Sequence, residues 1–176
     1  MKMAIDRVRA ETERLKLQAP PEYLAMLQAR PDIIDQVANG VGSEESWTYH
    51  VTPDTVWGLN INPTSHAHDW MYTFPMYFPS VAAGLAWKAL ADHYFDINGH
   101  IQVADGVWIL RPMRRARIDI YSAILIGGGV DAFWAHKPLP PDFDQYYSSR
   151  PSYDNKVVAR FMEIERIIHD VYPLYT

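Results

Sequence analysis

The sequence predicts a mainly α-helical fold with one small β-hairpin, on three observations. Apolar side chains recur every three or four residues in several segments, which is the period of an amphipathic helix. Residues that favour helix starts (Ser, Asn, Pro) and helix ends (Gly) separate these segments. No internal repeat or linker divides the 176 residues, so we expect one domain, residues 1–176, with its own core.

Two short helices are expected at the start of the chain. Residues 3–17 are rich in charge, and four of their side chains follow a helical period: Ile5, Val8, Thr12 and Leu15. Pro20-Pro21 ends this segment, and Pro21 can begin a second helix that reaches Ala29.

A third helix is expected from about Asp32 to Asn39-Gly40, because Asn-Gly is a good helix C-cap signal. Residues 41–59 then show no helical period, and they contain Pro53 and further glycines. We expect a long loop there, and loops of such length are usually functional.

The next two helices carry the polar residues of interest. Asn62 is expected to cap the first of them, with Pro63 in its first turn, and Pro75 ends it. Ser80 is expected to cap the second, which extends to about Ile97.

The remaining segments complete the prediction. Two short apolar runs, 101–103 and 107–109, flank Ala104-Asp105-Gly106 and predict the β-hairpin. A helix is expected over residues 112–126, closed by three glycines. The last helix places five apolar side chains on one stripe: Val157, Phe161, Ile164, Ile168 and Val171.

The composition excludes several classes of function. A formal net charge of −5 makes nucleic acid an unfavourable partner, because phosphate backbones attract clustered Lys and Arg. The chain has no cysteine, so it has neither a disulfide framework nor a thiolate metal site. No apolar run approaches a transmembrane segment, and the N-terminal residues lack the apolar core of a signal peptide. We therefore expect a soluble, cytoplasmic protein.

His68, Asp69 and Tyr72 lie within little more than one turn of the helix that begins near Asn62. His68 and Tyr72 are four residues apart and share a face, whereas Asp69 points about 100° away. A histidine can take a proton from water while its neighbouring carboxylate binds a cation.

Asp92 lies at a position of the next helix where an apolar core residue is expected. It shares a stripe with Val81, Leu85, Ala89 and Phe95. A buried carboxylate needs a partner, and a histidine is a natural one. If Asp92 accepts a hydrogen bond from Nδ1–H of His68, Nε2 stays available as a base.

Two other interpretations of these residues stay open. Asp92 can instead pair with an arginine, namely Arg111, Arg114 or Arg115, as a structural ion pair. His66 and His68 also suggest a transition-metal hydrolase, although Trp70 and Met71 stand where further zinc ligands are needed.

Four segments in this order resemble the phospholipase A2 superfamily, most closely its bacterial branch. They are Asn39-Gly40-Val41-Gly42, Pro53-Asp54-Thr55-Val56-Trp57-Gly58, Thr64-Ser65-His66-Ala67-His68-Asp69-Trp70-Met71-Tyr72 and Asp92-His93-Tyr94-Phe95. The resemblance covers about residues 38–98, and Ser65 stands where that family has a cysteine. It implies a cysteine-free, phospholipase A2-like pair of antiparallel helices with extra flanking helices.

The resemblance also implies an activity, the calcium-dependent hydrolysis of phospholipid or related acyl esters. His68 would be the general base, Asp92 its orienting carboxylate, and Tyr72 a supporting hydrogen-bond donor. Asp69 would bind Ca²⁺ together with backbone carbonyls of Asn39, Gly40 and Gly42. The alternative is a non-catalytic structural or binding protein, phage- or toxin-associated, that retains the helical pair. In either case, the segment from Arg111 to Trp134 is expected to pack beside the site or to form an oligomer contact.

Overall fold

The computed structural model describes residues 4–38 and 55–149. The helix expected over residues 157–171 and the Asn39-Gly40 cap lie outside these residues. Within them the protein is mainly helical with one two-stranded antiparallel sheet, so the predicted fold class is confirmed.

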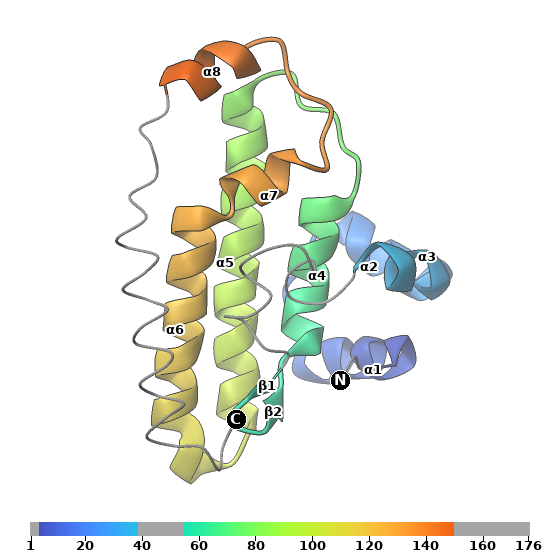
Figure 1. The fold of residues 1–176 in the computed structure, drawn as a ribbon. Coiled ribbons are helices and arrows are strands. Elements are labelled where there is room, and N and C mark those ends of the chain that lie inside the picture. The colour runs from blue at the N-terminus through green and yellow to red at the C-terminus, as the bar shows by residue number, and fades with distance from the viewer. Residues whose placement is uncertain (1–3, 39–54, 150–176) are drawn as a thin grey trace.

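Three long helices form the centre of the structure: α4 (Asn62–Thr73), α5 (Val81–Asp105) and α6 (Arg111–Gly128). Figure 1 shows that α4 and α5 run antiparallel and that α6 lies along the other side of α5. The predicted pair of antiparallel helices is therefore present, and it carries both His68 and Asp92.

Short helices cover the ends and one side of this centre. The N-terminal helices lie beside α4, and α7 crosses between α4 and α6 (Figure 1). Their bounds are α1 Ile5–Leu15, α2 Pro21–Ala29, α3 Pro31–Val37, α7 Val130–Trp134 and α8 Phe143–Ser149, with a 3₁₀ turn at Trp108–Leu110.

The β-hairpin occurs elsewhere than predicted. Strands β1 (Thr55–Val56) and β2 (Leu59–Asn60) are joined by a two-residue turn at Trp57-Gly58, and both turn residues have positive φ. Such turns match the twist of the strands that they connect. The prediction of a hairpin over residues 101–109 is wrong, because α5 continues to Asp105 and buries Gln102 and Val103. The Asp105-Gly106 pair ends a helix there.

The helix starts follow the predicted signals with one exception, whereas two helix ends were wrong: α5 continues past the expected end near Ile97 to Asp105, and α6 includes Gly127 and Gly128. Ser80 caps α5 by accepting a hydrogen bond from the backbone N–H of Ala83, as predicted. Asn62 does not cap α4, because the helix already begins at Asn62. Its backbone N–H donates instead to Oδ1 of Asn60, the last residue of β2.

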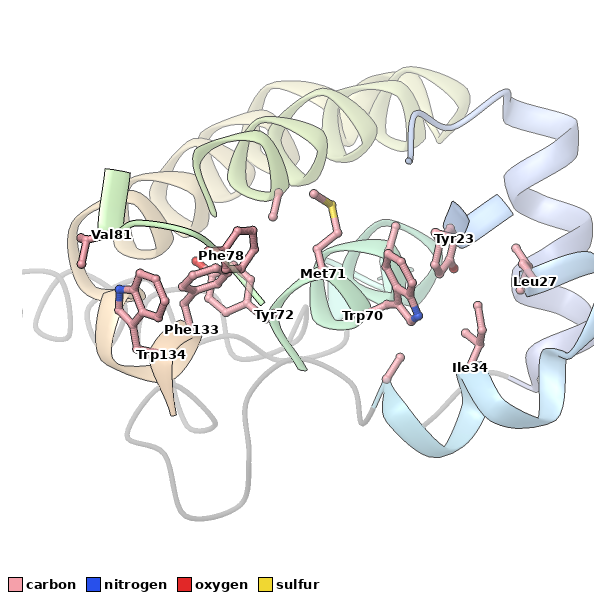
Figure 2. Packing of buried hydrophobic residues seen from close by; sticks show 13 residues of the cluster. Tyr23, Leu27, Ile34, Trp70, Met71, Tyr72, Phe78, Val81, Phe133 and Trp134 are labelled. Carbon is pink, nitrogen blue, oxygen red and sulfur yellow. The ribbon is translucent and has the colours of Figure 1, made fainter. Parts of the chain in front are cut away.

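The main hydrophobic cluster joins α4 to its neighbours. Figure 2 shows Trp70 and Met71 between the N-terminal helices and the region where Tyr72, Phe78, Phe133 and Trp134 meet. Every residue of α4 from Asn62 to Tyr72 is buried. The polar side chains of this helix are therefore inside the protein, where they need partners.

No helix in the described parts of the chain is long and apolar enough to cross a membrane.

Candidate active site

His68 lies between two aspartates, one from its own helix and one from α5. Its Nδ1 is 3.2 Å from Oδ1 of Asp69, and its Nε2 is 3.3 Å from Oδ1 of Asp92. The His68 side chain is only about 5% exposed. The two carboxylates thus approach opposite nitrogens of one buried imidazole.

This geometry confirms the predicted contact between His68 and Asp92, but Asp92 faces the other ring nitrogen from the one we expected. We expected Asp92 at Nδ1 with Nε2 available, whereas Asp92 faces Nε2 and Asp69 faces Nδ1. The expectation that Asp69 points away from His68 was wrong in the same way. Helical spacing fixes only the Cα–Cβ directions, and rotation of the side chains brings the neighbouring carboxylate back to the ring.

Asp92 is held by two further donors. The Tyr72 hydroxyl donates to Oδ1 at 2.7 Å, as predicted, and the Lys88 ammonium donates to Oδ2 at 2.7 Å. Lys88 also donates to the Leu125 carbonyl of α6 at 2.9 Å, so α6 packs beside the site. Asp92 therefore has an imidazole, a phenol and an ammonium around one buried carboxylate.

Sequence reasoning missed Lys88, although a signal was present. Lys88 and Asp92 are four residues apart on one helix, the spacing at which opposite charges meet. Two of the three arginines considered as partners for Asp92 have other roles. Arg114 donates to the Trp57 carbonyl at 2.8 Å, and Arg111 donates to the Gly106 carbonyl at 3.3 Å.

Tyr72 is fixed by close packing. Its ring lies over that of His68, with 4.2 Å between centroids, and it meets Phe133 edge to face. At the corner between α6 and α7, a Cβ on Gly129 would come within 2.6 Å of the Tyr72 hydroxyl and 3.3 Å of Cε of Lys88. A residue without a side chain is required there for the backbone to approach the site.

The surroundings shift the pKa values of the network. Burial by itself lowers the pKa of His68, but hydrogen bonds to Asp69 and Asp92 and their negative charges outweigh it, so the net shift is upward. For Asp92, burial favours the neutral acid, yet His68 and Lys88 hold the pKa of the carboxyl below its ordinary value. Burial, followed by the charge of Asp92, raises the pKa of Tyr72, which stays a hydrogen-bond donor. When His68 is protonated, the network contains two cations, His68 and Lys88, which face the carboxylates of Asp69 and Asp92.

The predicted calcium ligands are only partly placed. Asn39, Gly40 and Gly42 lie outside the described residues. Asp69 is buried next to His68 and offers the hard oxygen donor that calcium prefers. Because Ca²⁺ takes about six to eight oxygens, this carboxylate can be one ligand of a calcium site but cannot form it alone.

His66 does not join His68. Its Nδ1 is 3.5 Å from the hydroxyl of Tyr23, on α2, whereas His68 faces α5. Among the residues that the structure describes, one group of three side chains has ligand atoms close enough to share a metal ion: Asp96, His100 and Asp119. Neither His66 nor His68 belongs to this group. The geometry therefore gives no support to a transition-metal centre built on His66 and His68.

A groove of about 550 Å³ opens between α5 and α6 beside this network. Lys88 and Asp92 reach it from α5, while His68 is not part of its lining. Its other walls combine apolar side chains (Leu85, Ala89, Ala123, Ile126 and Val130) with polar ones (His93, Asp96, Asp119 and Ser122).

Comparison with known proteins gives no relative from which a function could be transferred: no family model, no curated protein and no solved structure matches the chain.

Proposed function

We propose that this protein is a phospholipase A2-like hydrolase that cleaves acyl esters of phospholipids or related lipids with water, in a calcium-dependent reaction. The observation that carries the proposal is the position of His68, whose Nε2 faces a buried Asp92 that also accepts a hydrogen bond from Tyr72. These residues lie in segments that resemble that family's motifs and follow one another in the same order.

Asp92 determines which nitrogen of His68 can work as a base. Since Tyr72 and Lys88 hold both carboxylate oxygens, Asp92 keeps its orientation and favours a proton on Nε2. The lone pair of a neutral His68 is then on Nδ1. A positioned base of this kind contributes about 10²- to 10⁴-fold to a rate.

Nδ1 is also the nitrogen whose partner can give way to water. The Asp69 side chain is 11% exposed and that of Asp92 is 4% exposed. A water that replaces Asp69 at Nδ1 would donate one proton to His68 as its oxygen attacks the ester carbonyl. His68 would then return this proton to the leaving alcohol, which yields a free fatty acid and a lysophospholipid.

Asp69 is the side chain that would bind calcium. Asp69 and the backbone carbonyls of Asn39, Gly40 and Gly42 would hold the ion, which supplies electrostatic stabilisation of the developing oxyanion when bound. The aspartate next to the base thus has a task separate from that of Asp92.

The raised pKa of His68 predicts the pH range of the reaction. His68 acts as a base only when it is unprotonated, so activity should increase as pH rises through that pKa.

A second candidate, a structural or binding protein without turnover, is favoured by one observation. Lys88 neutralises Asp92 inside the protein and ties α5 to α6 through the Leu125 carbonyl. A closed network of this kind would hold the helices together even if His68 never contacted a substrate.

Fatty-acid release from phosphatidylcholine in mixed micelles tests the two candidates. The hydrolase should release fatty acid with millimolar Ca²⁺ and stop when a chelator is added. Absence of release in both conditions, from alkaline to neutral pH, would contradict the proposed hydrolysis and leave the structural candidate.

A further inference from the structure

A second cluster of polar side chains lies on the outer face of α5 and α6, one turn beyond Asp92. It consists of Asp96 and His100, four residues apart on α5, and Asp119 on α6. We propose that these three residues bind a divalent transition-metal ion, for which zinc is the natural probe. This site goes beyond the proposed hydrolysis and shares no residue with the His68 network.

The distances within the cluster suit a shared ion. Nε2 of His100 lies 3.0 Å from Oδ1 of Asp119 and 3.6 Å from Oδ1 of Asp96. Tetrahedral ligands at zinc bond lengths of about 2.0 to 2.2 Å are separated by roughly 3.4 Å, which falls between these two values. Small side-chain movements would therefore allow all three atoms to contact one ion.

The ligand types select the class of metal. One imidazole and two carboxylates match ions such as Zn²⁺, Co²⁺ or Mn²⁺, whereas Ca²⁺ and Mg²⁺ prefer oxygen ligands throughout.

A neighbouring residue orients one of the ligands. The Ser122 hydroxyl on α6 donates to Oδ1 of Asp96 at 2.8 Å. Hydrogen bonds of this kind fix the direction of metal ligands and are part of most metal sites. The cluster therefore draws its ligands, and the support for one of them, from two packed helices.

The site would leave coordination positions open. Three protein ligands are one fewer than a closed tetrahedral zinc site uses, and they match the number in sites that keep a position for water or another ligand. Asp96, Asp119 and Ser122 also line the groove between α5 and α6. An ion here would present its open position to that groove, where a carboxylate or phosphate group could bind it.

The competing explanation is an ion pair that fastens α5 to α6. His100 and Asp119 are 34% and 63% exposed, and surface pairs of this kind stabilise a protein by about 1 kcal/mol or less. A pair of His100 and Asp119 would need neither Asp96 nor a metal ion. Metal binding therefore distinguishes the two explanations.

Isothermal titration of the full chain with zinc chloride tests the proposal, using His100→Ala and Asp119→Asn as variants. His93→Ala is the matched control, because His93 is an exposed histidine of α5 that lines the groove outside the cluster. The wild type and the control should bind one equivalent of zinc, and both cluster variants should bind at least about tenfold more weakly, since even loss of a supporting residue weakens metal sites by 10- to 100-fold.

Asp119→Asn keeps the test decisive if His100→Ala fails to fold, because the Asp119 side chain is largely exposed. The visible spectrum of bound Co²⁺ should also change in the cluster variants and not in His93→Ala. The proposal would be overturned if the wild type did not bind zinc, or if both cluster variants bound zinc as tightly as the wild type. The cluster would then be a surface ion pair only. Calcium dependence of lipid hydrolysis has no bearing on this result.

Discussion

Nζ of Lys88 lies 2.7 Å from Oδ2 of Asp92, one turn away on the same helix, and each side chain is about 4% exposed. Two charges so deeply buried stabilise a fold only when they stay together. Asp92 is therefore part of the architecture of the protein as well as the partner of His68.

Replacing Asp92 by Asn should be strongly destabilising. The change would leave Lys88 buried without a carboxylate, and breaking a buried pair costs roughly 3 to 5 kcal/mol. Urea unfolding measures the loss, with Asp96→Asn as the control one turn further along α5, where the side chain is 39% exposed. A free energy of unfolding equal to that of the control variant would contradict the importance of the Lys88–Asp92 pair.

The stability that His68 contributes should decrease as the pH rises. Its pKa is raised in the folded protein, so the contribution is fully present below the unfolded pKa of about 6.5 and is lost through the higher folded pKa. The free energies of unfolding of the wild type and His68→Gln should therefore converge over the interval in which the pH rises from about 6.5 through the raised pKa of folded His68. A difference that grows over this interval would show that His68 is neutral between its two aspartates.

Gly129→Ala should disturb the site although it replaces no charged residue. The new Cβ would come within 2.6 Å of the Tyr72 hydroxyl, so Tyr72 or the corner between α6 and α7 must move. Overpacking of this kind costs about 1 to 3 kcal/mol. Thermal unfolding measures the effect against Gly127→Ala, an exposed helical position where alanine should be neutral or stabilising. Equal midpoints for the two variants would mean that Gly129 is not tightly packed.

Tyr72→Phe isolates one hydrogen bond of the network. It removes the hydroxyl that donates to Asp92 at 2.7 Å and leaves the ring in place over His68. Hydrogen bonds to a charged group contribute about 1.5 to 3 kcal/mol, so unfolding should become easier by that amount. Tyr77→Phe is the control, because that side chain is 62% exposed and its hydroxyl is not part of the network. An unchanged unfolding free energy for Tyr72→Phe would show that Asp92 does not need this donor.

Residues with strong local signals were predicted well from the sequence. Ser80 marked the start of α5, and the helical stripe marked Asp92 as buried, because both depend on the spacing of nearby residues. The stripe was wrong for Ala89, which is exposed and lines the groove. The contact of Asp92 with both His68 and Tyr72 also followed from the resemblance and from helical faces.

Features that depend on unusual backbone or on rotamers were not predicted. Trp57 adopts a positive φ in the turn of the hairpin, which is rare for a large side chain and has no clear signal in composition. The position of Asp69 at Nδ1 of His68 depends on a side-chain rotation that sequence spacing does not determine. The His100–Asp119 pair joins two helices, and their relative register is set by packing across the interface.

The measurement that tests the central claim most directly is calcium-dependent fatty-acid release by His68→Asn, compared with the wild type and His93→Asn under identical conditions. His93 is an exposed histidine on α5, so it controls for the substitution itself. If His68 activates water at Nδ1, His68→Asn should lose about 10²-fold or more of the turnover, and His93→Asn should retain it. Equal release by His68→Asn and the wild type would contradict the assignment of His68 as the base.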